Sequence, residues 1–215
     1  MRKGQAAGIN VAKHERAPVI TLVDYHAGNL ASVRKAFEHL GCATVITEDP
    51  NVVRQARHVV VPGVGHFAAT EQLERAGLRA AITEAIQQGA NFLGICVGMQ
   101  WMFRDSAEAP GVYGLGLIAG TVERFPAGAR VPHVGWNTIQ QRGASQIMQG
   151  VPSSSFVYYT HSYRVPIVPE TVGITEYGDP FSGVVEKGSV FGIQFHPEKS
   201  GPAGLQMLKN FAELD

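Results

Sequence analysis

The most informative segment, residues 91–100, reads Asn91-Phe92-Leu93-Gly94-Ile95-Cys96-Val97-Gly98-Met99-Gln100. Its first five residues suit a strand buried on both faces of a parallel sheet, and a helix is expected to start over residues 99–103. Cys96 therefore falls on a strand-to-helix turn, where the strained backbone needs small neighbours such as Gly94 and Gly98. Such a turn lifts the sulfur above the carboxyl edge of the sheet, where α/β proteins bind ligands. The helix N-terminus would favour the thiolate.

Strands and helices alternate along the first half of the chain. Short apolar, β-branched runs predict strands at residues 19–23, 44–47 and 59–61, in addition to the strand before Cys96. Helical spacing predicts helices over residues 30–40 and 78–86, each followed by a glycine. This alternation predicts a parallel sheet with right-handed crossovers inside a three-layer α/β/α sandwich.

The second half is expected to extend that sheet with antiparallel strands and then return to it. Short strands joined by Gly/Pro turns are predicted at residues 121–125, 137–140, 156–165, 172–176, 183–187 and 190–195. A helix over about residues 203–214 closes the chain, with Leu205, Leu208 and Phe211 facing inward. Because no repeat or linker interrupts the pattern, residues 18–215 are expected to form one domain, preceded by a flexible extension, residues 1–17.

Composition excludes several classes of protein. Among 215 residues, 18 Lys and Arg balance 18 Asp and Glu, whereas a nucleic-acid partner usually requires a basic excess. The two cysteines, Cys42 and Cys96, are too few for a disulfide framework and lack metal-ligand spacing. A reducing cytoplasm is therefore expected, without a metal or other cofactor, and Cys42 is interpreted as a small core residue. Residues 1–17 lack the apolar core of a secretion signal, and no apolar run is long enough to span a membrane.

A second motif, Gln194-Phe195-His196-Pro197-Glu198, supplies partners for the cysteine. A predicted strand delivers His196 at its end, and Glu198 follows two residues on. A histidine base needs an acceptor on its second nitrogen, which fixes the tautomer and stabilises the imidazolium. Taken alone, Cys96 is as consistent with a small core residue as with a nucleophile. Together with His196 and Glu198, it favours a nucleophile, a base and an orienting acid.

The Gly-x-Cys-x-Gly turn and the later His-Pro-Glu resemble the class I, triad-type glutamine amidotransferases. This resemblance runs from about Ile20 to the C-terminal helix and implies a flavodoxin-like topology. Within that family, the segments His133-Val134-Gly135-Trp136-Asn137 and His196-Pro197-Glu198-Lys199-Ser200 resemble the glutaminase subunits of imidazole glycerol phosphate synthases. The chain departs from that pattern at His26-Ala27, at Val97 and at Tyr159-Thr160, and none of these departures removes a catalytic group.

The resemblance implies that Cys96 attacks the side-chain amide of glutamine and forms a thioester, with His196 moving the protons. The oxyanion of the intermediate would be bound by the N–H of Val97 and by the backbone of Gly63, Val64 and Gly65, whose glycines permit a peptide flip. The residues expected to bind glutamine are Gln100, Glu108, His161, Ser162 and Tyr163. Without the resemblance, Gln100 and Glu108 would be interpreted as a solvated helix face.

Ammonia released into water would be protonated, so it must pass directly to an acceptor. The sequence shows no phosphate-binding loop and no second catalytic domain, which implies a partner subunit. In the family resembled, the partner is a (βα)₈-barrel cyclase that makes imidazole glycerol phosphate and an aminoimidazole carboxamide ribotide in histidine biosynthesis. The residues expected near it are Asn29, Trp136 and Lys199, with a core position as the alternative for Trp136. Two other functions stay open: a glutaminase serving another acceptor, such as pyridoxal phosphate synthase, and a non-catalytic binding module of the same fold.

Overall fold

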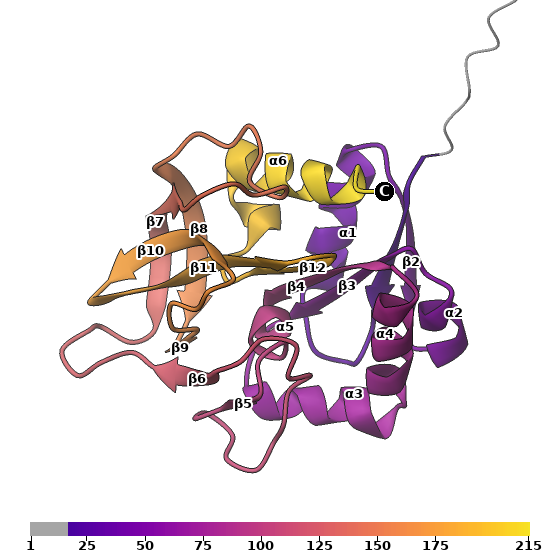
Figure 1. Cartoon of the computed structure of the whole chain (residues 1–215), viewed down its shortest axis with the longest axis horizontal. Helices are drawn as coiled ribbons and strands as arrows, with labels where there is room; N and C mark the ends of the chain where they lie inside the picture. Colours follow the sequence, from indigo (N-terminus) through magenta and orange to yellow (C-terminus); the bar gives the residue numbers. More distant parts are fainter. Residues whose placement is uncertain (1–16) are drawn as a thin grey trace, which may run out of the picture.

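The computed structural model describes residues 17–215. Within them, five parallel strands form one half of a central sheet in the order β2-β1-β3-β4-β12 (Figure 1). Both β3 and β4 are buried along their whole length, which explains why apolar residues follow His58 in β3 and Asn91 in β4. The strand order confirms the flavodoxin-like topology. The bounds are β1 Val19–Val23, β2 Ala43–Thr47, β3 His58–Gly63, β4 Asn91–Cys96 and β12 Val190–Ile193.

Four antiparallel strands continue the same sheet beyond β12, which confirms the predicted extension. They follow the order β11-β10-β7-β8 and are β11 Asp179–Lys187, β10 Thr171–Tyr177, β7 His133–Gln141 and β8 Ser155–His161. The single strand predicted over residues 156–165 is interrupted at Ser162. Its second part, β9 Tyr163–Arg164, joins a small sheet with β5 Asp105–Ser106 and β6 Thr121–Arg124. The interruption lets this stretch turn from the main sheet to the small one.

Helices cover both faces of the sheet, so the three-layer prediction is also confirmed (Figure 1). One face carries α1 Leu30–His39 and α6 Gly201–Ala212, and the other carries α2 Pro50–Arg54, α3 Glu71–Arg75, α4 Leu78–Gln87 and α5 Val97–Gln100. A separate apolar core lies on each face, and Cys42 belongs to one of them, as predicted. Two 3₁₀ turns, η1 Phe67–Thr70 and η2 Pro197–Lys199, complete the fold. The short elements α2, α3, η1 and η2 are too brief to leave a periodic signal in the sequence.

The helix after Cys96 differs from the prediction: it ends at Gln100 instead of continuing through Phe103. The carbonyl oxygens of residues 101–103 accept hydrogen bonds from backbone N–H groups of residues 115–118 instead of from a next helical turn. Gly114 allows this close approach, because a Cβ there would collide with two of those oxygens. The helix therefore supplies first-turn N–H groups at Cys96 but not the dipole of a long helix.

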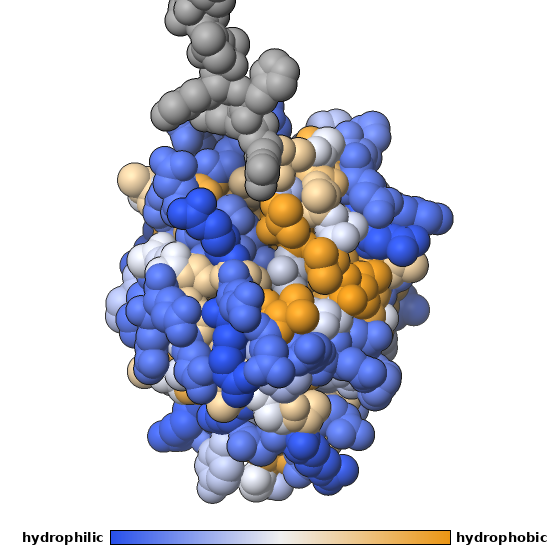
Figure 2. Space-filling view, turned by 90° about the vertical axis from the view of Figure 1, so that its right-hand side faces the viewer, coloured by the Kyte–Doolittle hydropathy of each residue, from blue (hydrophilic) through white to orange (hydrophobic). Residues whose placement is uncertain are grey.

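The strand β2 forms one edge of the main sheet and β8 the other. Figure 2 faces the side of the molecule where β2 lies and shows an apolar patch within a mostly polar surface. The exposed apolar side chains of this region are Val19, Val45, Ile46 and Val52. In residues 17–215 no helix is long and apolar enough to cross a membrane. The predicted flexible extension lies outside the described residues, except for Ala17.

Candidate active site

Cys96 occupies the predicted turn between β4 and α5. Its φ of +54° and ψ of −109° are unusual for a residue with a side chain, and this is the strain expected of a nucleophile on such a turn. A Cβ on Gly94 would collide with the carbonyl of Gly98, and a Cβ on Gly98 would collide with the carbonyl oxygen of Val61. Both flanking glycines are therefore required by the space available, as the sequence predicts.

His196 and Glu198 form a buried pair at the start of η2. The Nδ1 atom of His196 lies 3.0 Å from Oε1 of Glu198, and their side chains are 2% and 0% exposed. A carboxylate on Nδ1 leaves Nε2 to exchange protons with substrate. Among residues 17–215, neither Nε2 of His196 nor Oε2 of Glu198 has a hydrogen-bond partner. Burial disfavours the imidazolium, but Cys96 and Glu198 outweigh burial and raise the pKa of His196 to about 9.

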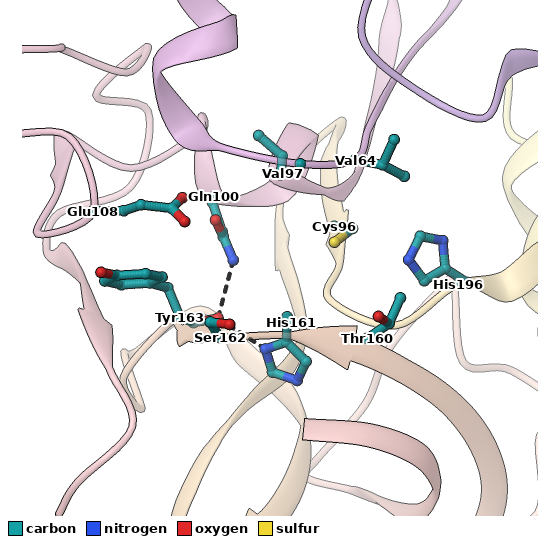
Figure 3. Close-up of a pocket in the computed structure, with 11 residues that line it drawn as sticks. Val64, Cys96, Val97, Gln100, Glu108, Thr160, His161, Ser162, Tyr163 and His196 are labelled. Atoms are coloured by element: carbon teal, nitrogen blue, oxygen red, sulfur yellow. Dashed lines mark hydrogen bonds between the residues drawn. The ribbon is translucent and has the colours of Figure 1, made fainter. Parts of the chain in front are cut away.

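One pocket brings most of the predicted site residues together (Figure 3). The sulfur of Cys96 and the ring of His196 lie on one side of it, and Gln100, Glu108 and Tyr163 lie on the other. Glu198 lies behind His196. Thr160 also lines the pocket and was not predicted, because it follows an apolar strand pattern that gives no sign of a binding role. The lining residues are Val64, Gly65, Cys96, Val97, Gln100, Glu108, Thr160, His161, Ser162, Tyr163 and His196.

The side-chain amide of Gln100 is buried and links two parts of the pocket. Its Nε2 donates to the carbonyl oxygen of Tyr163 at 3.1 Å and to Oε1 of Gln194 at 3.2 Å. The amide nitrogen of Gln194 lies in turn 3.8 Å from the sulfur of Cys96. Gln194 is a further residue without a predicted role, although it belongs to the quoted His-Pro-Glu motif. The solvated-face alternative for Gln100 is wrong, because the residue is 3% exposed.

Glu108 lies in a loop after β5, so the solvated-helix alternative is wrong for it as well. Its Oε2 accepts the backbone N–H of Phe67 at 2.8 Å, which fixes the carboxylate at the edge of the pocket (Figure 3). A fixed carboxylate at that position can bind an ammonium group of a substrate.

Two buried histidines connect the pocket to β7. Nδ1 of His161 must donate to the carbonyl oxygen of Tyr163, 2.8 Å away, so in the neutral ring Nε2 of His161 accepts. Nδ1 of His133, which lies 3.1 Å from Nε2 of His161, then donates to it. On the other side of the His133 ring, the amide nitrogen of Asn137 lies 3.4 Å from Nε2. Burial lowers the pKa of His133 to about 4 and that of His161 to about 3, so both rings are neutral at pH 7. The resemblance implies a glutamine-binding role for His161 but not this link to His133.

The backbone groups predicted for the oxyanion hole lie around Cys96. Val97 is the first residue of α5, so its N–H has no acceptor within that helix. Gly63 pairs with Cys96 across β3 and β4, and an idealised Cβ on Gly63 would lie 2.7 Å from the Cβ of Val97. Gly65 has a φ of +95° and no atom near the position of a Cβ, so the peptide before Gly65 has the conformational freedom that a flip requires.

Two of the predicted interface residues, Trp136 and Lys199, meet at Tyr158. Trp136 is 56% exposed, so the alternative of a core position is wrong. Its ring packs edge-on against Tyr158, with 5.9 Å between the ring centres. The ammonium of Lys199 lies 6.0 Å from the centre of the Tyr158 ring. Asn29 lies elsewhere, in the loop between β1 and α1, as the N-cap residue of α1.

Comparison with known proteins identifies the family of the chain. The model of the family described as glutamine amidotransferase class-I matches residues 21–214. The chain therefore belongs to the class-I glutamine amidotransferases and is an enzyme of that class. It is also 46% identical to the imidazole glycerol phosphate synthase subunit HisH of Moorella thermoacetica over 198 residues, covering 91% of this chain and 94% of that protein. The HisH subunit of Deinococcus radiodurans is 46% identical over 200 residues, covering 91% and 93% of the two chains. Within the class, the chain belongs to the family of HisH subunits.

Solved structures confirm the fold at lower identity. A crystal structure of a glutamine amidotransferase superposes with a TM-score of 0.72 and 18% identity, covering 91% of this chain and all of that one. The structure of PurLQS from Thermotoga maritima superposes with a TM-score of 0.67 and 19% identity, covering 91% of this chain and 98% of that one.

Proposed function

We propose that this chain is the glutaminase subunit of an imidazole glycerol phosphate synthase, with Cys96 as nucleophile, His196 as base and Glu198 as its orienting acid. The observation that carries the proposal is the strained, glycine-flanked Cys96 in the same pocket as His196, whose ring is paired with the buried side chain of Glu198. Its relatives of 46% identity are named as HisH subunits of that synthase, which supports the same function here.

The reaction begins when the Cys96 thiolate attacks the side-chain amide carbon of glutamine. His196, held as imidazolium near neutral pH, protonates the departing ammonia. A thioester on Cys96 remains, and water attacks it with His196 acting as base, which releases glutamate. In both halves of the reaction, Glu198 holds Nδ1 of His196 and stabilises the positive ring.

Backbone N–H groups stabilise the negative oxygen of each tetrahedral intermediate. Val97 supplies one donor, and the segment Gly63, Val64 and Gly65 supplies the second after a peptide in it turns its N–H toward Cys96. Losing one such donor typically costs about 3 kcal/mol of transition-state stabilisation. A hole that forms only in the assembled enzyme would keep the isolated chain from hydrolysing glutamine without an acceptor.

Glutamine is bound through its amino-acid end at the far side of the pocket. The carboxylate of Glu108 binds the α-ammonium group, and Gln100 orients the substrate beside it. The segment from His161 through Ser162 to Tyr163 provides backbone groups for the carboxylate and amide. The bonds from Gln100 and His161 to the carbonyl of Tyr163 hold this wall in place.

Ammonia passes to a partner subunit with the (βα)₈-barrel fold, which uses it to make imidazole glycerol phosphate and the aminoimidazole carboxamide ribotide. The exposed ring of Trp136, with the half-buried Tyr158 and Lys199 beside it, supports docking of such a partner. Asn29, at the start of α1, is proposed as a further contact. Large exposed aromatic side chains are common anchors of protein interfaces.

The test is glutaminase activity of the wild type and of Cys96→Ala, each with and without the barrel subunit. Wild type with partner should turn over glutamine and transfer ammonia to the formimino precursor, and Cys96→Ala should do neither. Glutaminase activity without ammonia transfer to that precursor would favour another acceptor. Failure of a glutamine-analogue electrophile to label Cys96 would favour a binding module instead.

A further inference from the structure

Tyr25 follows β1 at the carboxyl edge of the sheet, in line with the nucleophile. Leu22 of β1 pairs with Val60 of β3, so continuing that register places Tyr25 beside Gly63. Gly63 pairs in turn with Cys96 of β4. The side-chain packing agrees, because an idealised Cβ on Gly63 would lie 2.6 Å from the Tyr25 hydroxyl oxygen. That hydroxyl therefore lies directly against the segment proposed to form the oxyanion hole.

The Tyr25 hydroxyl is buried and has no hydrogen-bond partner among residues 17–215. The residue as a whole is 2% exposed. A buried hydroxyl without a partner is destabilising, so such a group often marks a contact that forms in another state. Burial and the nearby charge of Cys96 both raise the pKa of Tyr25, so its oxygen keeps its proton and can donate.

The neighbouring backbone can supply the missing acceptor. When a peptide between Gly63 and Gly65 turns its N–H toward Cys96, its carbonyl oxygen turns the opposite way. Gly65 tolerates such a rotation, since its φ is already +95° and the space around its Cα is open.

We propose that Tyr25 is a positioning residue for the oxyanion hole: its hydroxyl donates to a carbonyl of the Gly63–Gly65 segment once that segment has turned an N–H toward Cys96. The bond is absent in the resting conformation and present during the reaction. It therefore favours the competent conformation without touching glutamine. This inference rests on the proposed glutaminase function of Cys96.

The experiment compares wild type, Tyr25→Phe and Tyr159→Phe, each as the complex with the barrel subunit. Tyr25→Phe should lower kcat for glutamine hydrolysis about tenfold and leave KM within twofold, because the lost bond forms only during the reaction. Its melting temperature should be unchanged or higher, because an unpartnered hydroxyl is removed. Tyr159→Phe should do the opposite, since that buried hydroxyl bonds Oγ1 of Thr175 at 2.6 Å: lower melting temperature and unchanged kcat.

A merely structural role for Tyr25 would lower the melting temperature along with kcat, and that result, or an unchanged kcat, would overturn the inference. A second pair of variants replaces Tyr25 by 4-aminophenylalanine, which restores a donor, or by 4-fluorophenylalanine, which does not. Activity should return with the first and not with the second. If the wild-type complex itself fails to hydrolyse glutamine, the proposed function fails; if only the Tyr25 variants match wild type, this inference alone fails.

Discussion

Gln194 places its amide nitrogen 3.8 Å from the sulfur of Cys96 while its own oxygen accepts a hydrogen bond from Gln100 at 3.2 Å. Gln194 is fully buried, and these two contacts fix the orientation of its side-chain amide. The sulfur of Cys96 is thus contacted by a neutral donor that is not part of the proposed triad. Because a donor near sulfur stabilises the thiolate more than the thiol, Gln194 should influence the reactivity of Cys96.

Replacing Gln194 should therefore slow the chemistry at Cys96. We expect Gln194→Leu to lower kcat/KM about tenfold, since it removes one donor and leaves Gln100 with one acceptor fewer. Both variants should also slow alkylation of Cys96 at pH 7. Gln194→Glu should slow it more than Gln194→Leu, because it places a carboxylate beside the sulfur. Iodoacetamide labelling, followed at Cys96 by mass spectrometry, measures this order, and equal rates in the two variants would contradict it.

The raised pKa of His196 predicts an alkaline limit to activity. Glutamine hydrolysis should fall as pH rises through about 9, because His196 then loses the proton that ammonia needs to depart. Charged His196 also stabilises the fold in the same pH range. Its contribution to the free energy of unfolding is complete below about pH 6.5 and disappears as pH rises through about 9.

Glu198→Gln should move that limit to lower pH and reduce kcat roughly 10²- to 10⁴-fold, because the carboxylate no longer stabilises the imidazolium. The pH–rate profile of the complex is the measurement. A limit that stays near pH 9 in Glu198→Gln would show that this carboxylate does not set the protonation of His196.

The buried histidine pair predicts loss of stability in acid. His133 and His161 have lowered pKa values in the folded chain, so their contribution is present above about pH 6.5 and disappears as pH falls through about 4 and 3. His133→Asn retains a donor toward His161 but cannot be protonated. Urea unfolding between pH 4 and pH 8 should therefore depend less on pH in the variant than in wild type, and parallel curves would refute this explanation.

Gly98 should tolerate no side chain at all. Gly98→Ala forces a Cβ into the carbonyl oxygen of Val61 and should destabilise the chain by about 1–3 kcal/mol or more, with loss of activity through displacement of Cys96. Gly143→Ala is the comparison, since Gly143 has a φ of +79°, unlike Gly98 in α5, but no atom lies near the position of a Cβ there. Gly143→Ala should destabilise the chain only through the strain of a left-handed backbone, by about 1–2 kcal/mol. Denaturant unfolding of both variants gives the comparison.

Trp136 should contribute to assembly without contributing to the fold. Because its ring is 56% exposed, Trp136→Ala should leave the melting temperature of the isolated chain nearly unchanged. Binding of the barrel subunit should weaken by about 2 kcal/mol, roughly 30-fold in Kd, as for a typical interface anchor. Tyr113→Ala, at an aromatic residue that is 66% exposed, is the matched control and should bind as wild type does in calorimetry.

The parallel half of the sheet was predictable because β3 and β4 are buried on both faces, so that apolar runs such as Val59-Val60-Val61 mark them in the sequence. The turn at Cys96 was predictable because its two glycines have a steric cause. The end of α5 was not predictable, since it depends on carbonyl groups of residues 101–103 bonding a loop twelve or more residues later.

Side-chain partners were harder to predict than backbone position. Nothing in local sequence indicates that Gln194 contacts sulfur or that His133 meets His161 across two strands. The roles of Gln100 and Glu108 came from family resemblance, while their fixed geometry comes from contacts with Tyr163 and Phe67.

The ordered chain of hydrogen bonds from Tyr163 through the two imidazoles to Asn137 has a spectroscopic consequence. Each ring is held in one tautomer, with hydrogen on Nδ1 and none on Nε2, and the two nitrogens of such a ring differ widely in ¹⁵N chemical shift. His133 begins the strand that also displays Trp136, whereas His161 borders the pocket. Isotope labelling of histidine alone would therefore provide two native NMR probes, one on the strand proposed to dock the partner and one beside the proposed glutamine pocket.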